Sequence, residues 1–510
     1  MKKLFAAASA LAIAAGAAYV PVKETPAAAA EIIGYRGDVN TDMNVNIADV
    51  VKLQRTLLGD DMLSEDGIWW ADLDADGYID AFDLTLLRQI VMGLREPEAV
   101  YSGEADFIDP PIYDLYGTLP SQGPARLCIF YVDFPDCKYS NEPSNEEIAQ
   151  IAFGPQNSSD RNYPFESMTG FYERSSKGAM ELSGEVYRYT AQHEKSYYEN
   201  DVWKKNLVNE VMANMDSTVD FSQFDADSDG VIDAMLFSVP NAAGDDEWWP
   251  CAGQFGGDSR KKYDGTTIGH VITGNAEISS TTDYLEFNRT YLHEMGHCMG
   301  LPDFYLYNSG SDFEGLHGSA GYTLMDDATA DFAAVSKLQL GWYRSDQIEV
   351  YSGGTQTYTL TNAQTDSGNC LVIPCGELDS NYQSEYMLVE YSTLDANNSY
   401  VGEYYWWRKT GSGVRVLHVE GTITGDYWYN TYTYSSGNDE ATNNDAGKRF
   451  VRVIDDAEKD NLYHTGDVID GNISGFHWYD QSGGQTVDTG ITITVGEFTD
   501  GTVTVTVSGG

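Results

Sequence analysis

The stretch HEMGHCMGLPD, residues 293–303, decides the fold of the central part of the chain. Residues four apart lie on one face of a helix, so His293 and His297 direct two imidazoles to the same point. Two neutral imidazoles and one carboxylate suit a zinc ion with an open fourth position. Glu294 lies beside them and can take a proton from a water on that ion. The stretch therefore predicts a zinc-binding helix with a general base.

The residues after the second histidine predict the end of the helix and the third ligand. Gly300 tolerates positive φ and can end the helix, and Pro302 prevents it from resuming. The chain then turns back, so Asp303 can supply an oxygen ligand. Glu314, further downstream, is the competing third ligand. The alternative to a metal site is a surface helix with two solvated histidines.

A longer run around this motif, LHEMGHCMGLPDFY, resembles the immune inhibitor A family of secreted zinc metallopeptidases. Four other segments resemble core elements of that family: ARLCIFYVDFPD (125–136), FYERSSKGAMELSGEVY (171–187), FDADSDGVIDAMLFSVP (224–240) and DFAAVSKLQLGW (331–342). The resemblance covers about residues 124–505. It implies that His293, His297 and Asp303 bind zinc and that Glu294 is the base. It also makes Met325 a candidate for the methionine turn beneath the metal.

Residues 38–59 and 72–93 form an internal repeat with a period of 34 residues. Each copy begins with a 12-residue loop that has oxygen-bearing side chains at positions 1, 3, 5, 9 and 12. Position 7 adds a backbone carbonyl, and six or more oxygens around one point are typical of calcium. The repeat therefore predicts two calcium sites. Their ligands would be Asp38, Asn40, Asp42, Asn44, Asn46 and Asp49 in the first loop, and Asp72, Asp74, Asp76, Tyr78, Asp80 and Asp83 in the second.

Each acidic loop leads into an amphipathic helical pattern, but no entering helix precedes it as in an EF-hand. This arrangement resembles a type I dockerin, the module by which secreted enzymes attach to cohesin modules of a cellulosome scaffold. The resemblance implies a cohesin partner that contacts loop positions 10 and 11. These positions hold Ile47, Ala48, Ala81 and Phe82. Met43 stands at position 6, where glycine would ease the turn. The alternative is a calcium-stabilised module without a partner.

A third acidic loop, D-x-D-x-D-G-x-x-D, contains Asp225, Asp227, Asp229 and Asp233. It leads into an apolar run typical of a strand and has no acid at position 12. We expect a further, structural calcium ion here, completed by ligands from elsewhere. The alternative is a plain acidic turn with Gly230 at its corner.

The N-terminal residues 1–30 have the pattern of a secretory signal: two lysines, an apolar run and a small-residue end. The alternative is a membrane anchor, but the run is short for a span. We expect no membrane span in the mature chain, which would be secreted and attached to a scaffold or a cell surface. The net charge of −49 excludes a phosphate-neutralising surface, so we expect no nucleic-acid partner. Six cysteines are too few for a disulfide-built fold, although Cys370 and Cys375 are close enough to bridge a hairpin.

The predicted organisation is multidomain. We expect a small α dockerin at 33–95, a proline-containing linker at 96–123 and an α+β zincin-like catalytic domain at 124–345. Alternating Thr and Val at 502–507 predict a β-sandwich-like C-terminal region at 346–510. Trp406, Trp407 and Trp428 of that region serve either core packing or carbohydrate binding.

The sequence thus predicts a secreted zinc endopeptidase that cleaves protein or peptide substrates and is attached to a cellulosome scaffold. The alternative is an inactive zincin shell with a carbohydrate-binding C-terminal region, delivered by the dockerin. A glycoside hydrolase would need a carboxylate pair, and nothing in the sequence specifically supports one.

Overall fold

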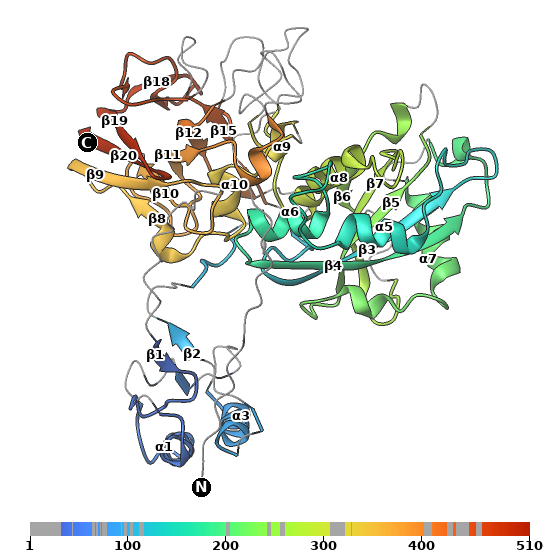
Figure 1. Ribbon diagram of the computed structural model, residues 1–510, viewed down its shortest axis with the longest axis horizontal. Helices are drawn as coiled ribbons and strands as arrows, with labels where there is room; N and C mark the ends of the chain where they lie inside the picture. Colours follow the sequence, from blue (N-terminus) through green and yellow to red (C-terminus); the bar gives the residue numbers. More distant parts are fainter. Residues whose placement is uncertain are drawn as a thin grey trace, which may run out of the picture. The chain divides into compact units, whose positions relative to one another are not determined.

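The computed structural model divides the chain into two compact units, Met1–Ala105 and Asp106–Gly510 (Figure 1). The structure describes residues 32–42, 44–63, 67, 70–71, 73, 79–92, 94–95, 99–101, 106–111, 117–199, 204–241, 246–255, 261–305, 322–327, 329–401, 411–425, 432–434, 448–454 and 462–509. The predicted signal sequence at 1–30 lies outside these residues. No helix among the described residues is both long enough and apolar enough to cross a membrane.

The first unit contains the two predicted loop-and-helix repeats. Helices α1 (Ile47–Leu57) and α3 (Ala81–Val91) share a small core that includes Leu53 and Leu87. Each helix begins with a capping box, in which an N-cap side chain and an acid three residues later exchange hydrogen bonds with the backbone. Strands β1 (Ile32–Tyr35) and β2 (Ala99–Tyr101) pair antiparallel, so the two ends of the module lie side by side.

The second unit contains a five-stranded sheet with the order β4-β3-β5-β7-β6. Its parallel strands are β4 (Met180–Thr190), β3 (Gly123–Asp133), β5 (Val231–Ser238) and β7 (Thr267–Gly274), and β6 (Cys251–Gln254) is an antiparallel edge strand. One face packs on α5 (Asn145–Phe153), α6 (Met168–Ser175) and α8 (Leu285–Cys298), and the other on α7 (Lys205–Met215). The sequence predicted a mixed α+β domain, and the structure shows an α/β sheet covered on both faces, as parallel sheets are.

Two further sheets form from the C-terminal residues. The five-stranded sheet has the order β15-β12-β11-β10-β8, and the four-stranded sheet the order β16-β19-β20-β9. Their bounds are β8 (Ile348–Val350), β9 (Gly354–Thr361), β10 (Cys370–Pro374), β11 (Glu385–Ser392), β12 (Gly413–Glu420), β15 (Val451–Val453), β16 (Val468–Ile469), β19 (Ile491–Thr499) and β20 (Thr502–Gly509). The sheets share a core in which Val503, Val505 and Val507 are buried between the more exposed threonines of β20. The alternation in the sequence is thus present in the fold.

Short elements complete the described part of the second unit. The helices are α9 (Leu324–Asp327) and α10 (Ala334–Gln339), and the 3-10 turns are η1 (Lys195–Tyr197), η3 (Phe221–Phe224), η4 (Asp246–Trp248), η6 (Ser345–Gln347) and η7 (Ala396–Asn398). The remaining strands pair as β13 (Ile423–Gly425) with β14 (Tyr432–Tyr434), and β17 (His477–Tyr479) with β18 (Gln485–Asp488). None of the six cysteines forms a disulfide bond, and all six lie among the described residues. Cys370 begins β10 and Cys375 follows its end, so the two do not bridge a hairpin.

A single core crosses the boundary that the sequence predicted at residue 345. The second face of the β10–β12 sheet, with Val372, Leu388 and Leu417, belongs to the same buried cluster as α8 and α10. The predicted linker is also partly bound to this unit, because the backbone N–H of Ile108 donates to the carbonyl of Tyr343 (3.0 Å). The two regions that the sequence predicted on either side of residue 345 therefore form one compact unit from Asp106 onward.

Candidate metal centre

Helix α8 carries the histidines and ends where the sequence predicts. Its last residue is Cys298, and Gly300 follows with φ of 100°, a left-handed conformation that favours glycine. The N–H of Leu301 then donates to the carbonyl of Gly296 (3.1 Å), which closes the helix end. The chain reverses at this point and brings Asp303 back over the last turn of the helix.

His293, His297 and Asp303 converge on one point. Oδ1 of Asp303 lies 3.0 Å from Nε2 of His293 and 3.2 Å from Nε2 of His297. Tetrahedral coordination with bonds of about 2.0–2.1 Å places neighbouring ligand atoms about 3.3 Å apart. The oxygen-to-nitrogen spacing therefore fits a small divalent cation, and all three ligand atoms lie within 4.8 Å of one another.

The second nitrogen of each imidazole fixes the orientation of its ring. Nδ1 of His293 donates to the carbonyl of Leu324 (2.7 Å), and Nδ1 of His297 donates to the carbonyl of Leu301 (2.7 Å). Because a carbonyl can only accept, each Nδ1 carries a proton, and in the neutral ring the Nε2 lone pair faces Asp303. Three acceptors facing one another need positive charge between them, which either two extra protons or one metal ion supplies.

Without a metal ion, protons provide this charge. Burial is the largest single effect and lowers the pKa of His297, but the hydrogen bond to Asp303 and the charges of Asp303 and Glu294 together outweigh it and raise that pKa to about 9. The pKa of His293 is also raised, and the two histidines hold the pKa of Asp303 well below its usual range despite burial. A metal ion would displace these protons, so its affinity must fall as the pH falls.

Glu294 is a residue of α8, and its side chain lies beside the edge strand β6. Its side chain is buried, and burial raises the pKa of its carboxyl, while a hydrogen bond from the backbone of Ala252 in β6 opposes the shift. A buried carboxylate beside a cation site can act as a general base or general acid. Glu294 therefore has the position that the sequence predicted for the base.

Met325 packs beneath the two histidines. A Cβ atom built on Gly296, which lies between them in α8, would be 2.4 Å from the sulfur of Met325. The N–H of Phe304 also donates to the carbonyl of Met325 (2.8 Å). The structure therefore places Met325 where the resemblance predicted the methionine turn. It also explains why position 296 has no side chain.

Several groups at this centre escaped sequence reasoning. The carbonyls of Leu301 and Leu324 and the backbone of Ala252 are main-chain groups, which a motif of side-chain types does not identify. Glu314, the competing third ligand, lies outside the described residues. Tyr305, whose ring is 6.3 Å from that of His293 and nearly parallel to it, is a further neighbour of the metal ligands.

The first loop of the N-terminal module is described with all its predicted ligands. Asp49 is buried, and its two oxygens accept the N–H groups of Asn40 (3.0 Å) and Asn46 (2.8 Å). Asp38 accepts the N–H of Asp42 (2.9 Å), and Asn44 lies between them and Asn46 in the same loop. The acid at position 12 thus holds both ends of the loop together.

The second loop is described at Leu73, its second position, and from Ile79 to its end. Asp83 accepts the N–H groups of Leu73 (2.7 Å) and Asp80 (2.8 Å), as Asp49 does in the first loop. The bond from loop position 9 is the same in both repeats, whereas the other comes from position 2 in this loop and from position 3 in the first. The other predicted ligands, Asp72, Asp74, Asp76 and Tyr78, lie outside the described residues, as does Met43 of the first loop.

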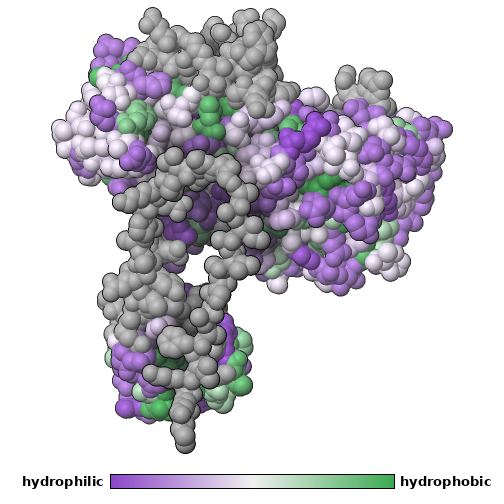
Figure 2. Space-filling view, viewed as in Figure 1, coloured by the Kyte–Doolittle hydropathy of each residue, from purple (hydrophilic) through white to green (hydrophobic). Residues whose placement is uncertain are grey.

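The four predicted partner contacts occupy the first turns of α1 and α3. Ile47 is 64% exposed and Phe82 is 57% exposed, and both Ala48 and Ala81 are exposed. Figure 2 shows hydrophobic side chains at the surface of this module. Burial of such side chains against a partner is favourable, so both helix starts offer a contact surface.

The third acidic loop brings three of its four predicted ligands together. Carboxylate oxygens of Asp225, Asp227 and Asp229 lie within 4.8 Å of one another. Oδ1 of Asp225 is buried and has no hydrogen-bond partner among the described residues. Asp233 is buried instead under the loop, where it accepts the N–H groups of Ala226 (3.1 Å) and Arg126 (2.8 Å). The loop can hold a cation with three carboxylates and is closed by the fourth.

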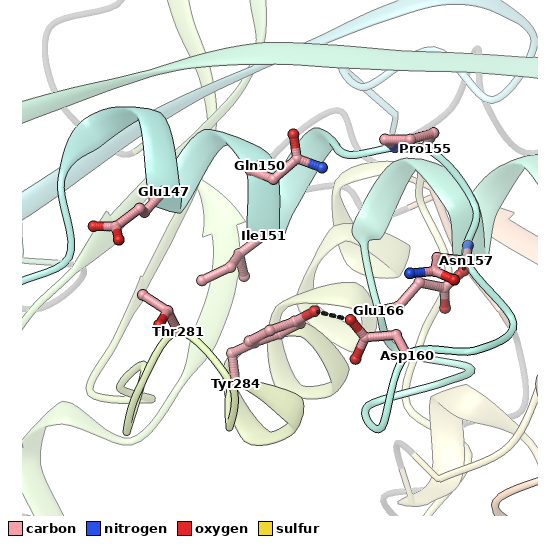
Figure 3. Close-up of a pocket in the computed structure, with 9 residues that line it drawn as sticks. All are labelled: Glu147, Gln150, Ile151, Pro155, Asn157, Asp160, Glu166, Thr281 and Tyr284. Atoms are coloured by element: carbon pink, nitrogen blue, oxygen red, sulfur yellow. Dashed lines mark hydrogen bonds between the residues drawn. The ribbon is translucent and has the colours of Figure 1, made fainter.

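A cavity of about 260 Å³ opens near the start of α8 (Figure 3). Ile151 of α5 and Tyr284 form part of its wall, and Tyr284 donates to Asp160 (2.9 Å). The rest of the lining is Glu147, Gln150, Pro155, Asn157, Glu166 and Thr281. Tyr284 precedes His293 by nine residues, and a helix turns about 100° per residue, so the two lie on opposite sides of α8. The cavity is therefore separate from the metal centre.

Comparison with known proteins identifies the N-terminal module. Residues 36–92 match the family model described as the dockerin type I domain, so the chain carries a type I dockerin. Type I dockerin domains bind calcium, and a dockerin implies a cohesin partner. Proteins that carry one are typically extracellular and bound to a cellulosome. The dockerin prediction is thereby confirmed.

No curated protein matches this chain. Among solved structures, the crystal structure of wild-type OgpA from Akkermansia muciniphila is similar, with 12% identity over 56% of this chain and 73% of that chain. The TM-score of this pair is 0.23, which is too low to carry an argument about fold or function. The resemblance to immune inhibitor A peptidases therefore stays a prediction.

Proposed function

We propose that this protein is a secreted zinc-dependent endopeptidase that its dockerin attaches to a cellulosome scaffold. The observation that carries the proposal is the convergence of His293, His297 and Asp303 on one point, with Glu294 buried beside them. Structural zinc sites usually have four protein ligands, whereas catalytic sites have three and an open position. The described residues supply three ligand atoms here, which supports a site of the second kind.

The ligand chemistry favours zinc over calcium at this centre. Calcium takes six to eight oxygen ligands, whereas two imidazole nitrogens and one carboxylate suit zinc. Zinc, when bound, supplies a Lewis acid that polarises a carbonyl and lowers the pKa of water towards about 7. His293, His297 and Asp303 would hold it. The protons that bridge these residues in its absence would leave.

Glu294 provides the proton transfers of the proposed reaction. Its carboxylate takes a proton from the attacking water and later donates it to the nitrogen of the leaving amine. Because α8 buries the carboxyl on one side and β6 covers it on another, few other waters compete for that proton.

The edge strand β6 supports a polypeptide substrate. Among the described strands it ends the sheet and pairs only with β7, so no described strand uses the backbone groups of its other edge. An extended peptide can bind such an edge through main-chain hydrogen bonds. Because Ala252 of β6 lies beside Glu294, a peptide on this edge would run past the metal centre.

The reaction class is tested with a mixture of peptides incubated with the zinc-loaded chain, followed by mass spectrometry of the products. New amino termini inside the peptides are expected, and a zinc-selective chelator should prevent them. Glycopeptides and polysaccharides serve as parallel substrates. Release of sugars with intact peptide bonds would show that the reaction is not proteolysis.

Calcium is proposed in both dockerin loops and in the loop of Asp225, Asp227 and Asp229. Replacing Asp227 with asparagine removes one of three clustered carboxylates. It should therefore lower the number of calcium ions bound per chain by one, as measured by titration calorimetry. The variant should also lose part of the calcium-dependent rise in melting temperature. A bound calcium ion adds about 2.7 kcal/mol to the free energy of unfolding when free calcium is at 100 times its dissociation constant. Asp216, an exposed residue outside the loop, gives the control Asp216→Asn. Equal calcium binding in both variants would leave the loop as a plain acidic turn.

The alternative of an inactive shell that binds carbohydrate depended on Trp406, Trp407 and Trp428. These three residues lie outside the described part of the chain. No contact or exposure among the described residues favours this alternative over the peptidase.

A further inference from the structure

We infer that the C-terminal β-sheet completes the metal centre, with Phe450 as a positioning residue that holds Asp303 in place through Phe304. The inference rests on the proposed function, because it concerns the third ligand of the proposed zinc site. It gives the sheet of β15, β12, β11, β10 and β8 a role in the chemistry, in addition to its packing role.

Asp303 depends on its neighbours because the chain around it has no regular structure. The segment from Leu301 to Phe304 is neither helix nor strand. Its hydrogen bonds include those from Leu301 to Gly296 and from Phe304 to Met325. The side chain of Phe304 is fully buried, which makes it the apolar anchor directly after the ligand. The position of the carboxylate therefore follows the position of the Phe304 ring.

Phe450 is the aromatic contact of that anchor. The two ring centroids are 5.6 Å apart, and the rings meet edge to face at 66°. Such aromatic pairs prefer this geometry and hold both rings in one orientation. Phe450 is itself buried and belongs to the same core cluster as Phe304.

The backbone of Phe450 is fixed by the C-terminal sheet. Its carbonyl accepts the N–H of Glu420, the last residue of β12 (3.0 Å). The next residues form β15, in which Val451 pairs with Val419 and Val453 with Leu417. Phe450 thus presents its ring from the position directly before a paired strand, whereas Phe304 belongs to an irregular segment. The sheet thereby fixes the position of Asp303 through the rings of Phe450 and Phe304.

A second contact from the same sheet supports the orientation of His293. The guanidinium of Arg415 in β12 lies 4.9 Å from the ring centroid of Tyr322. Arg415 is held by an ion pair with Glu390 (3.0 Å). Two residues beyond Tyr322, the carbonyl of Leu324 accepts the hydrogen bond from Nδ1 of His293. The sheet therefore supports one orienting contact for a histidine and one for the carboxylate.

The expected effect is on metal affinity. Partners that orient metal ligands typically change affinity about 10- to 100-fold when they are removed. His293 and His297 lie on one helix and keep their spacing without Phe450. Asp303 lies outside the helix and would lose its position without Phe450. Zinc would then be held mainly by the two histidines.

The test measures zinc affinity of the full chain by competition with a chromophoric chelator. Phe450→Ala is expected to bind zinc about tenfold more weakly than the wild type, and Phe450→Leu is expected to fall between them. Phe498→Ala is the matched control, because Phe498 also belongs to the C-terminal strands but packs on Tyr391, away from the metal centre (5.3 Å between ring centroids). The control should bind zinc as the wild type does. Near-UV circular dichroism identifies the variants that remain folded, and if Phe450→Ala unfolds, Phe450→Leu is compared with Phe498→Leu.

A double-mutant cycle separates positioning from general destabilisation. In a chain that already carries Asp303→Ala, replacing Phe450 should weaken zinc no further, because the ligand it positions is gone. An undiminished affinity in the folded single variant, or the same loss with and without Asp303, would overturn the inference. A wild-type chain that binds no zinc would overturn the proposed metal centre itself, and the inference with it. The two failures are therefore distinct.

Discussion

Replacing Glu294 with glutamine is expected to lower the rate of peptide cleavage about a thousandfold while zinc remains bound. Glutamine has nearly the same size and can still accept the hydrogen bond from Ala252, so the buried site should keep its shape. Its amide cannot take a proton from water. His293, His297 and Asp303 are unchanged, and the metal affinity should stay within about twofold of the wild type, well below the loss seen when an orienting partner is removed.

The measurement is kcat/KM on a peptide that the wild type cleaves, together with the zinc content of both proteins. Glu286→Gln is the matched control. Glu286 lies in the first turn of the same helix, and its side chain is 58% exposed. The control should cleave at the wild-type rate. If Glu294→Gln also does so with zinc bound, Glu294 is not the base and the proposed mechanism fails.

Replacing Asp49 with alanine is expected to unfold the first calcium repeat and abolish capture of cohesin. Asp49 is buried and accepts two backbone N–H groups that no other described side chain satisfies in the same way. A hydrogen bond to a charged group contributes about 1.5–3 kcal/mol, so loss of the two bonds costs about 3–6 kcal/mol. A core of this size supplies only about 3–5 kcal/mol. The loss of a calcium ligand adds to that cost.

The measurement is retention of the full chain on immobilised type I cohesin modules in calcium, with proteolysis assayed in parallel. Asp60→Ala, at an exposed acid after α1, is the control and should be retained like the wild type. Cleavage of peptides should be unaffected in both variants, because the metal centre belongs to the other unit. Retention of Asp49→Ala with unchanged affinity would show that the first repeat is not needed for capture.

Local signals in the sequence were sufficient for α8 and for the acidic loops. The spacing of His293 and His297 gives one helix face, and Gly300 with Pro302 gives the helix end, because these effects act within a few residues. The closing acids of the dockerin loops are also local, since Asp49 and Asp83 act within their own 12 residues. Asp303 was identified for the same reason, as it follows the helix end directly.

Contacts between distant segments could not be predicted in this way. The run Leu371–Ile373 is apolar at each position, which indicates a strand buried on both faces but does not say what covers either face. One face meets the four-stranded sheet and the other meets the helices of the metal centre, so the boundary predicted at 345 divides a common core. The carbonyls of Leu301 and Leu324 could not be assigned either. Any residue supplies a carbonyl, and only the fold decides which ones face Nδ1.

That common core limits how this protein can be recombined with other modules. A gene fusion joined at residue 345 would give one product with the apolar face of β10–β12 uncovered and another without the partner of Phe304. A fusion joined between Ala105 and Asp106 would separate two units that each keep their own core. The dockerin can therefore be exchanged at that point for one of another cohesin specificity. The C-terminal strands and helix α8 share a core, so they must be kept together in any fusion.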